Sequence, residues 1–278
     1  MSAFSPSDAA LEGFQVIRTQ WRVALGWCLF SLVGFVGLVI LAFFAILAAA
    51  FVVTSREQAG TAGSVIGAVV LGVGGSAVQG LVLAALYRLR LRPDAAPGIY
   101  YLRITRDEGR LFGLWLAMAA GFIALMTAGF LLLRALDQVS GLAAGVGALA
   151  YLALLLWLAM RFSLAGPANF ATGRFGLADS WRLTKGRVWA LLGMVLLALC
   201  LLVLIAVVLF IVTAVIQAAI GGFQTLAPVS LSDPEALAER PGAYAFALIA
   251  ELMIAPLYLV IAQTPFVAAY QALSAEPD

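Results

Sequence analysis

The chain has 278 residues, of which 64% are hydrophobic and only 11% are charged. Soluble domains are about half apolar and about one quarter charged, so this composition excludes a soluble globular fold and indicates lipid as the main solvent. The absence of histidine excludes imidazole metal sites, His-dependent triads and His acid–base catalysis. The formal net charge of +2 carries little information, because the sidedness of charge matters more than its sum in a membrane protein.

The N-terminal segment predicts an amphipathic helix over residues 6–20. Ser5 is a suitable N-cap, and Pro6 suits the first helical position. Apolar residues then recur at a spacing of three or four residues, at Leu11, Phe14, Ile17 and Trp21. We interpret this segment as a helix in the plane of the membrane interface. The alternative is a solvated segment that leads into the first span.

Six apolar runs follow, each longer than the roughly 20 residues that cross a bilayer as a helix. They predict an all-α, polytopic membrane protein with six transmembrane helices, over about residues 23–53, 63–89, 111–136, 142–164, 188–216 and 243–270. The second run is rich in glycine, which allows close helix packing, and its Gly74-Gly75 pair permits a kink.

The connectors are predicted from polar residues and prolines. Residues 54–62 should form a polar loop, and Pro93 and Pro97 should end the second helix before a short helical or extended piece over 99–105. Pro167 should break the fourth span, and residues 217–242 should form a long loop with one short helix over 234–240. Pro256 and Pro265 should interrupt the sixth span.

The distribution of basic residues predicts the orientation. Of the 16 Arg and Lys residues, 13 fall on the side of the N-terminus, and only Arg56, Arg134 and Arg240 fall on the other side. By the positive-inside rule, both termini are cytoplasmic, and we expect a multi-pass protein of a bacterial inner membrane.

The starts of the odd-numbered spans resemble one another. When they are aligned, three arginines coincide (Arg22, Arg110 and Arg187), as do Arg18 with Arg106 and Gly109 with Gly186. This predicts a threefold repeat of lead-in plus helical hairpin within one domain (1–278), with units 5–92, 93–165 and 166–272. The alternative is that headgroup chemistry selects arginine wherever a helix enters the membrane.

The fourth connector carries a family resemblance. Residues 176–187 (GLADSWRLTKGR), preceded by 161–167 (RFSLAGP), resemble a six-span bacterial inner-membrane family. That family is grouped with the glycerophosphoryl diester phosphodiesterase membrane domain and its uncharacterised stand-alone relatives. Composite members carry catalysis in a separate soluble domain. Since these 278 residues contain no such domain, the resemblance implies a six-span membrane fold and no enzyme activity.

Glu251 is the main intramembrane candidate, because an ionised carboxylate at that depth costs a few kcal/mol (about 2.5 or more) unless it is paired, hydrated or protonated. It is interpreted as a proton- or substrate-coupling residue, with Gln79 and Arg134 as companions. The alternative is structural: a hydrogen bond to Gln79, Thr127 or Gln217, or an ion pair with Arg134.

The cytoplasmic basic and aromatic residues are candidates for binding lipid headgroups, since each basic residue near an anionic leaflet contributes about 1 kcal/mol. The alternative is that they only enforce topology. The candidates are Arg18, Arg22, Arg106, Arg110, Trp181, Arg182, Lys185, Arg187 and Trp189.

These features predict a non-enzymatic membrane protein that engages membrane lipids, anionic ones included, or partner membrane proteins, further copies of itself among them. It would do so through cytoplasmic interfacial segments and intramembrane grooves. The first alternative is a transporter that uses Glu251, and the second is an accessory protein of membrane lipid metabolism. No cofactor, metal or nucleic-acid partner is predicted, because no matching motif is present.

Overall fold

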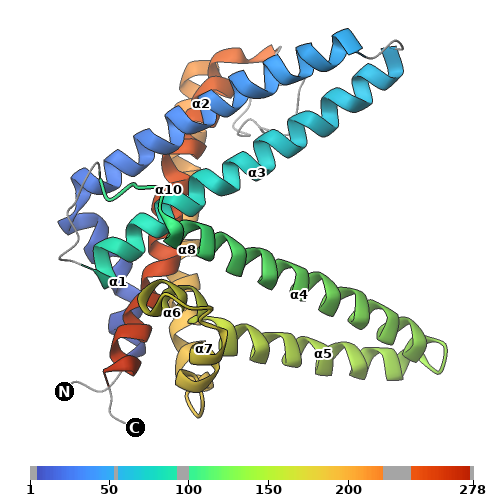
Figure 1. The fold of residues 1–278 in the computed structure, drawn as a ribbon, viewed down its shortest axis with the longest axis vertical. Helices are drawn as coiled ribbons and strands as arrows, with labels where there is room; N and C mark the ends of the chain where they lie inside the picture. The colour runs from blue at the N-terminus through green and yellow to red at the C-terminus, as the bar shows by residue number, and fades with distance from the viewer. Residues whose placement is uncertain (1–4, 53–55, 93–99, 222–238, 276–278) are drawn as a thin grey trace. The chain divides into compact units, whose positions relative to one another are not determined.

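The fold is all-α in the computed structural model, which describes residues 5–52, 56–92, 100–221 and 239–275 (Figure 1). Within these ranges there is no β-strand, and six helices are long and apolar enough to cross a membrane. They are α2 (Trp21–Val52), α3 (Arg56–Leu91), α4 (Arg106–Asp137), α5 (Gly141–Phe162), α8 (Val188–Gly221) and α10 (Pro241–Ser274). The predicted six-span fold class is therefore confirmed.

Three shorter helices accompany the six long ones: α1 (Pro6–Thr19), α6 (Ala165–Thr172) and α7 (Leu177–Leu183). α1 confirms the helix that was predicted over residues 6–20, and it starts where expected, with the Asp8 amide donating to the Ser5 hydroxyl at 3.5 Å. α6 ends at Gly173, whose φ of 71° forms the left-handed cap that favours glycine.

Four of the predicted boundaries are wrong. Residues 56–62 belong to α3 and 217–221 to α8, so both helices extend further than predicted, α3 into polar sequence and α8 past Gln217. Pro167 is the third residue of α6, where a missing amide hydrogen costs little, so it does not break the chain there. α10 is continuous through Pro256 and Pro265. The predicted helix over 234–240 lies outside the described residues except for its last two positions.

Contacts divide the chain into two compact units. Unit 1 comprises the described residues within 1–10, 84–196 and 264–278, and unit 2 those within 11–83 and 197–263. α1, α3, α8 and α10 contribute residues to both units. The predicted repeat units follow different boundaries, and the threefold repeat stays a prediction.

Unit 1 contains the hairpin of α4 and α5 and the short helices α6 and α7 (Figure 1). Its buried core includes Tyr87, Phe170 and Leu164, and the Tyr87 and Phe170 rings lie 5.7 Å apart. The Ser180 hydroxyl donates to the Arg161 carbonyl at 2.8 Å and accepts from the Leu164 amide at 3.2 Å. This buried serine therefore fastens α7 to the end of α5.

Unit 2 contains the hairpin of α2 with most of α3, which run side by side in Figure 1. Small residues make this approach possible, because a methyl group added at Gly34 would lie 3.1 Å from a Val78 methyl carbon, and one at Gly74 would meet Leu38. Gly72 and Gly75 face open space instead, and α3 is one helix through all of these glycines.

Candidate functional site

Arg88, near the end of α3, is the most buried arginine among the described residues, with 6% of its surface exposed. It forms an ion pair with Glu108 in the first turn of α4. It also donates hydrogen bonds to the Tyr101 carbonyl at 2.9 Å and to the Thr105 hydroxyl at 3.3 Å. Thr105 and Glu108 form a capping box, so Glu108 both starts α4 and neutralises Arg88.

A second ion pair lies beside the first. Arg92 donates to the Asp107 carboxylate at 2.8 Å and to the Phe170 carbonyl at 2.8 Å, and Arg110 also pairs with Asp107. The guanidinium of Arg92 lies 4.9 Å from the centre of the Phe170 ring. We call Arg88, Arg92, Asp107, Glu108 and Arg110 the Arg88 cluster. It ties the end of α3 to the start of α4 and to α6.

The turn between these helices has an unusual backbone. Tyr100 and Tyr101 have φ angles of 53° and 63°, a left-handed conformation that costs a non-glycine residue about 1 kcal/mol or more. The hydrogen bond from Arg88 to the Tyr101 carbonyl helps to hold this turn. Residues 100–105 are not helical, which excludes the helical alternative for this part of the 99–105 segment.

Arg161, at the end of α5, is buried against two indole rings that contact each other edge to face. Its guanidinium carbon lies 4.2 Å from the Trp181 ring centre and 5.6 Å from that of Trp157, and it donates to the Thr184 hydroxyl at 3.2 Å. No described carboxylate forms an ion pair with it. Trp181, predicted as an interface residue, thus also covers a buried cation.

The remaining predicted basic residues are largely exposed: Arg18, Arg22, Arg106, Arg182 and Lys185. Arg182 has a side chain that is 73% exposed and lies 3.8 Å from Asp179, a separation typical of weak surface pairs. Trp189 is 81% exposed at the start of α8, whereas Arg187, just before it, is partly buried. Of the predicted headgroup residues, Arg110 is the one committed to the Arg88 cluster.

The aligned glycines differ in conformation. Gly186 has a φ of 78° in the turn before α8, whereas Gly109 lies inside α4. The three aligned arginines also differ, because Arg22 is exposed, Arg110 is paired with Asp107, and Arg187 is partly buried. Matching positions in the sequence therefore have different local structures.

Glu251 lies in α10 with its side chain exposed, and no described basic residue forms an ion pair with it. Gln79 carries a buried side-chain oxygen that accepts no hydrogen bond from the described chain. Arg134 is exposed, 5.6 Å from the centre of the Phe130 ring, and Thr127 donates to the backbone of its own helix at 2.9 Å. Glu251 and Gln79 belong to unit 2 and Arg134 to unit 1, and their predicted pairing stays a prediction.

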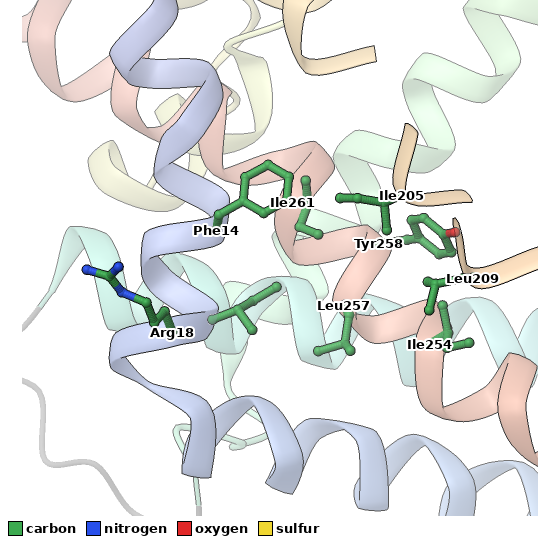
Figure 2. Close-up of a pocket in the computed structure, with 9 residues that line it drawn as sticks. Phe14, Arg18, Ile205, Leu209, Ile254, Leu257, Tyr258 and Ile261 are labelled. Atoms are coloured by element: carbon green, nitrogen blue, oxygen red, sulfur yellow. The ribbon is translucent and has the colours of Figure 1, made fainter. Parts of the chain in front are cut away.

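Each unit also has an apolar hollow. In unit 1 a hollow of about 360 Å³ lies between α4 and α5, and Leu177 of α7 also lines it. In unit 2 a hollow of about 300 Å³ lies between α1, α8 and α10, with Arg18 as its one charged lining residue (Figure 2). Neither hollow is lined by an acid, and no group of three or more metal-binding side chains occurs in the described ranges.

Sequence reasoning missed most of the buried polar residues. The capping-box pattern at Thr105 and Glu108 was available from the sequence, as was the four-residue spacing of Arg88 and Arg92 on one helix face. Arg161 gave no comparable signal, because an arginine at the end of a span is ordinary.

Comparison of the chain with family models, with curated proteins and with solved structures finds no match.

Proposed function

We propose that this chain is a non-enzymatic inner-membrane protein that engages anionic lipids through its basic, cytoplasmic segments and its intramembrane hollows. The observation that supports this most is the division of its basic residues. Arg88, Arg92 and Arg110 form ion pairs with two carboxylates, whereas Arg18, Arg182 and Lys185 leave their charge exposed beside helices that are apolar enough to span a membrane.

Exposed arginine and tryptophan at the mouths of apolar helices suit the headgroup region of a bilayer. Trp21 and Trp189 open α2 and α8 and are both exposed, and Arg22 lies 5.4 Å from the Trp21 ring centre. The resemblance of the 161–187 connector to the bacterial inner-membrane family belongs to the same proposal.

The test is retention of anionic lipid by the Arg182→Ala/Lys185→Ala double variant. Each residue contributes about 1 kcal/mol, so we expect phosphatidylglycerol affinity to fall by roughly tenfold or more. Native mass spectrometry of the full chain from mixed phosphatidylglycerol and phosphatidylethanolamine nanodiscs measures the change. Arg134→Ala is the control, because Arg134 is an exposed arginine near the C-terminal end of α4, where the opposite membrane face is predicted. Unchanged phosphatidylglycerol retention in the double variant would remove these residues from the proposal.

A second candidate function is transport, and the exposed carboxylate of Glu251 within α10 favours it. A transporter that couples protons through Glu251 would lose its flux in proteoliposomes in the Glu251→Gln variant while keeping its fold. An unchanged flux in that variant would end this alternative.

A further inference from the structure

The hollow in unit 2 has walls from three helices. α1 supplies three lining residues, α8 two and α10 four, and eight of the nine are apolar or aromatic. Figure 2 shows Phe14, Ile205, Leu257 and Ile261 around this space. An apolar hollow of about 300 Å³ inside a membrane protein is suited to hydrocarbon and offers water almost no hydrogen-bonding partner.

A close contact fixes the α1 wall. A methyl group added at Gly13 would lie 2.8 Å from the Ile261 Cα and 3.1 Å from its carbonyl oxygen, so α1 lies directly against the α10 backbone. Pro265 has no amide hydrogen to donate to that carbonyl. The Ile261 carbonyl therefore lacks its usual helical hydrogen bond at the point where α1 packs. Val16, one turn further along α1, is also buried. The α1 wall of the hollow is therefore packed closely against α10.

Arg18 gives the hollow its charge. Its stem belongs to the lining, and Figure 2 shows its guanidinium directed away from the apolar side chains. The side chain is exposed, and no described carboxylate pairs with it. Arg18 lies three residues before Trp21, the first residue of a candidate span, so its charge belongs at the membrane interface.

We propose that this hollow holds an acyl chain of an anionic phospholipid whose phosphate pairs with Arg18. The inference rests on the proposed function and gives it one specific site. A phosphate accepts two parallel hydrogen bonds from a guanidinium, and the acyl chain next to it matches the apolar lining. An α-helix, about 10 Å across with its side chains, does not fit inside a hollow of about 300 Å³, which favours an acyl chain over a partner helix as the occupant.

Two variants test the two ends of the site separately. Leu257→Trp fills the hollow from α10, and Ile249→Trp is its control, because Ile249 is an exposed apolar residue of the same helix outside the lining. Arg18→Gln removes the charge, and Arg134→Gln is its control, because Arg134 is exposed, does not line the hollow and is not a headgroup candidate. Ile205→Phe fills the hollow from α8 and serves if Leu257→Trp does not fold.

The measurement is native mass spectrometry of the full chain in nanodiscs that hold phosphatidylglycerol and phosphatidylethanolamine. We expect Arg18→Gln and a filling variant each to lower phosphatidylglycerol binding about fivefold, with no further loss when they are combined, and the controls to keep it. Phosphatidylglycerol with a photoreactive acyl chain should also label peptides of α1, α8 and α10.

The outcomes separate this site from the general function. If both filling variants bind phosphatidylglycerol like the original chain, Arg18 acts only as a surface charge and the acyl site is wrong, while the proposed function stands. Binding of a free fatty acid without phosphatidylglycerol, or loss of both lipids alike, also overturns the phosphate assignment. If the Arg182→Ala/Lys185→Ala variant keeps its lipid but the hollow variants lose theirs, the site survives without the wider proposal.

Discussion

Individual arginines in this chain have different roles, and burial with pairing distinguishes them. Arg88 and Arg161 are both nearly inaccessible, yet the first forms an ion pair with Glu108, whereas the second is held by aromatic rings and a hydroxyl. A guanidinium held in this way costs desolvation, which only several good partners can offset. Exposed residues such as Arg182 pay little desolvation and gain little from a partner at 3.8 Å. The exposed arginines are therefore the ones whose charge is accessible to a ligand such as a lipid headgroup.

This difference predicts the stability of single variants. Arg88→Ala should lower the free energy of unfolding by about 3–5 kcal/mol, because it leaves the buried Glu108 carboxylate without its partner. Arg182→Ala should change it by at most about 1 kcal/mol. Reversible unfolding of the two variants in mixed detergent micelles gives both values. Equal effects would mean that the Arg88 pair contributes no more than a surface pair.

At the scale of elements, the long helices could be predicted from the sequence because hydropathy is summed over about 20 residues, which averages out single polar positions. α6 and α7 could not be predicted, since helices of eight and seven residues depend on tertiary burial, here of Phe170 and Ser180. The Arg88–Glu108 pair also lay beyond prediction, because it depends on the left-handed turn at Tyr100 and Tyr101. Pro256 and Pro265 led to a wrong prediction of interruptions in α10, since a membrane helix tolerates proline where other groups satisfy the freed backbone carbonyls.

The contact between α1 and α10 gives a prediction whose sign depends on position. Replacing glycine by alanine inside a helix usually stabilises it by about 0.4–1 kcal/mol. Gly72→Ala should do so, because open space surrounds the added methyl group. Gly13→Ala should instead destabilise by about 1–3 kcal/mol, since the methyl group meets the Ile261 backbone. Unfolding midpoints of the two variants, followed by tryptophan fluorescence, check this. Stabilisation by both would show that α1 does not pack at Gly13.

At the scale of the whole molecule, the distribution of charge predicts the orientation. Of the 16 basic residues, 13 are predicted to lie on the side of the N-terminus, and that group includes the arginines of the Arg88 cluster and the exposed basic residues of the 161–187 connector. The acidic residues predicted on the same side, Asp107, Glu108 and Asp179 among them, do not alter the prediction, because the rule depends on arginine and lysine. The ion pairs inside the Arg88 cluster are therefore compatible with the predicted cytoplasmic location.

Cysteine labelling tests that orientation directly. In a background with Cys28 and Cys200 replaced by alanine, Gln138→Cys places a thiol in the exposed turn between α4 and α5, and Lys185→Cys places one in the exposed turn before α8. A membrane-impermeant maleimide should label Gln138→Cys in intact spheroplasts and Lys185→Cys only after permeabilisation, because the positive-inside rule predicts a cytoplasmic location for the basic connector. Retained expression and equal labelling of both thiols in detergent serve as the control. Labelling of Lys185→Cys from outside would reverse the topology, and with it the placement of Arg18, Arg182 and Lys185 on the cytoplasmic leaflet.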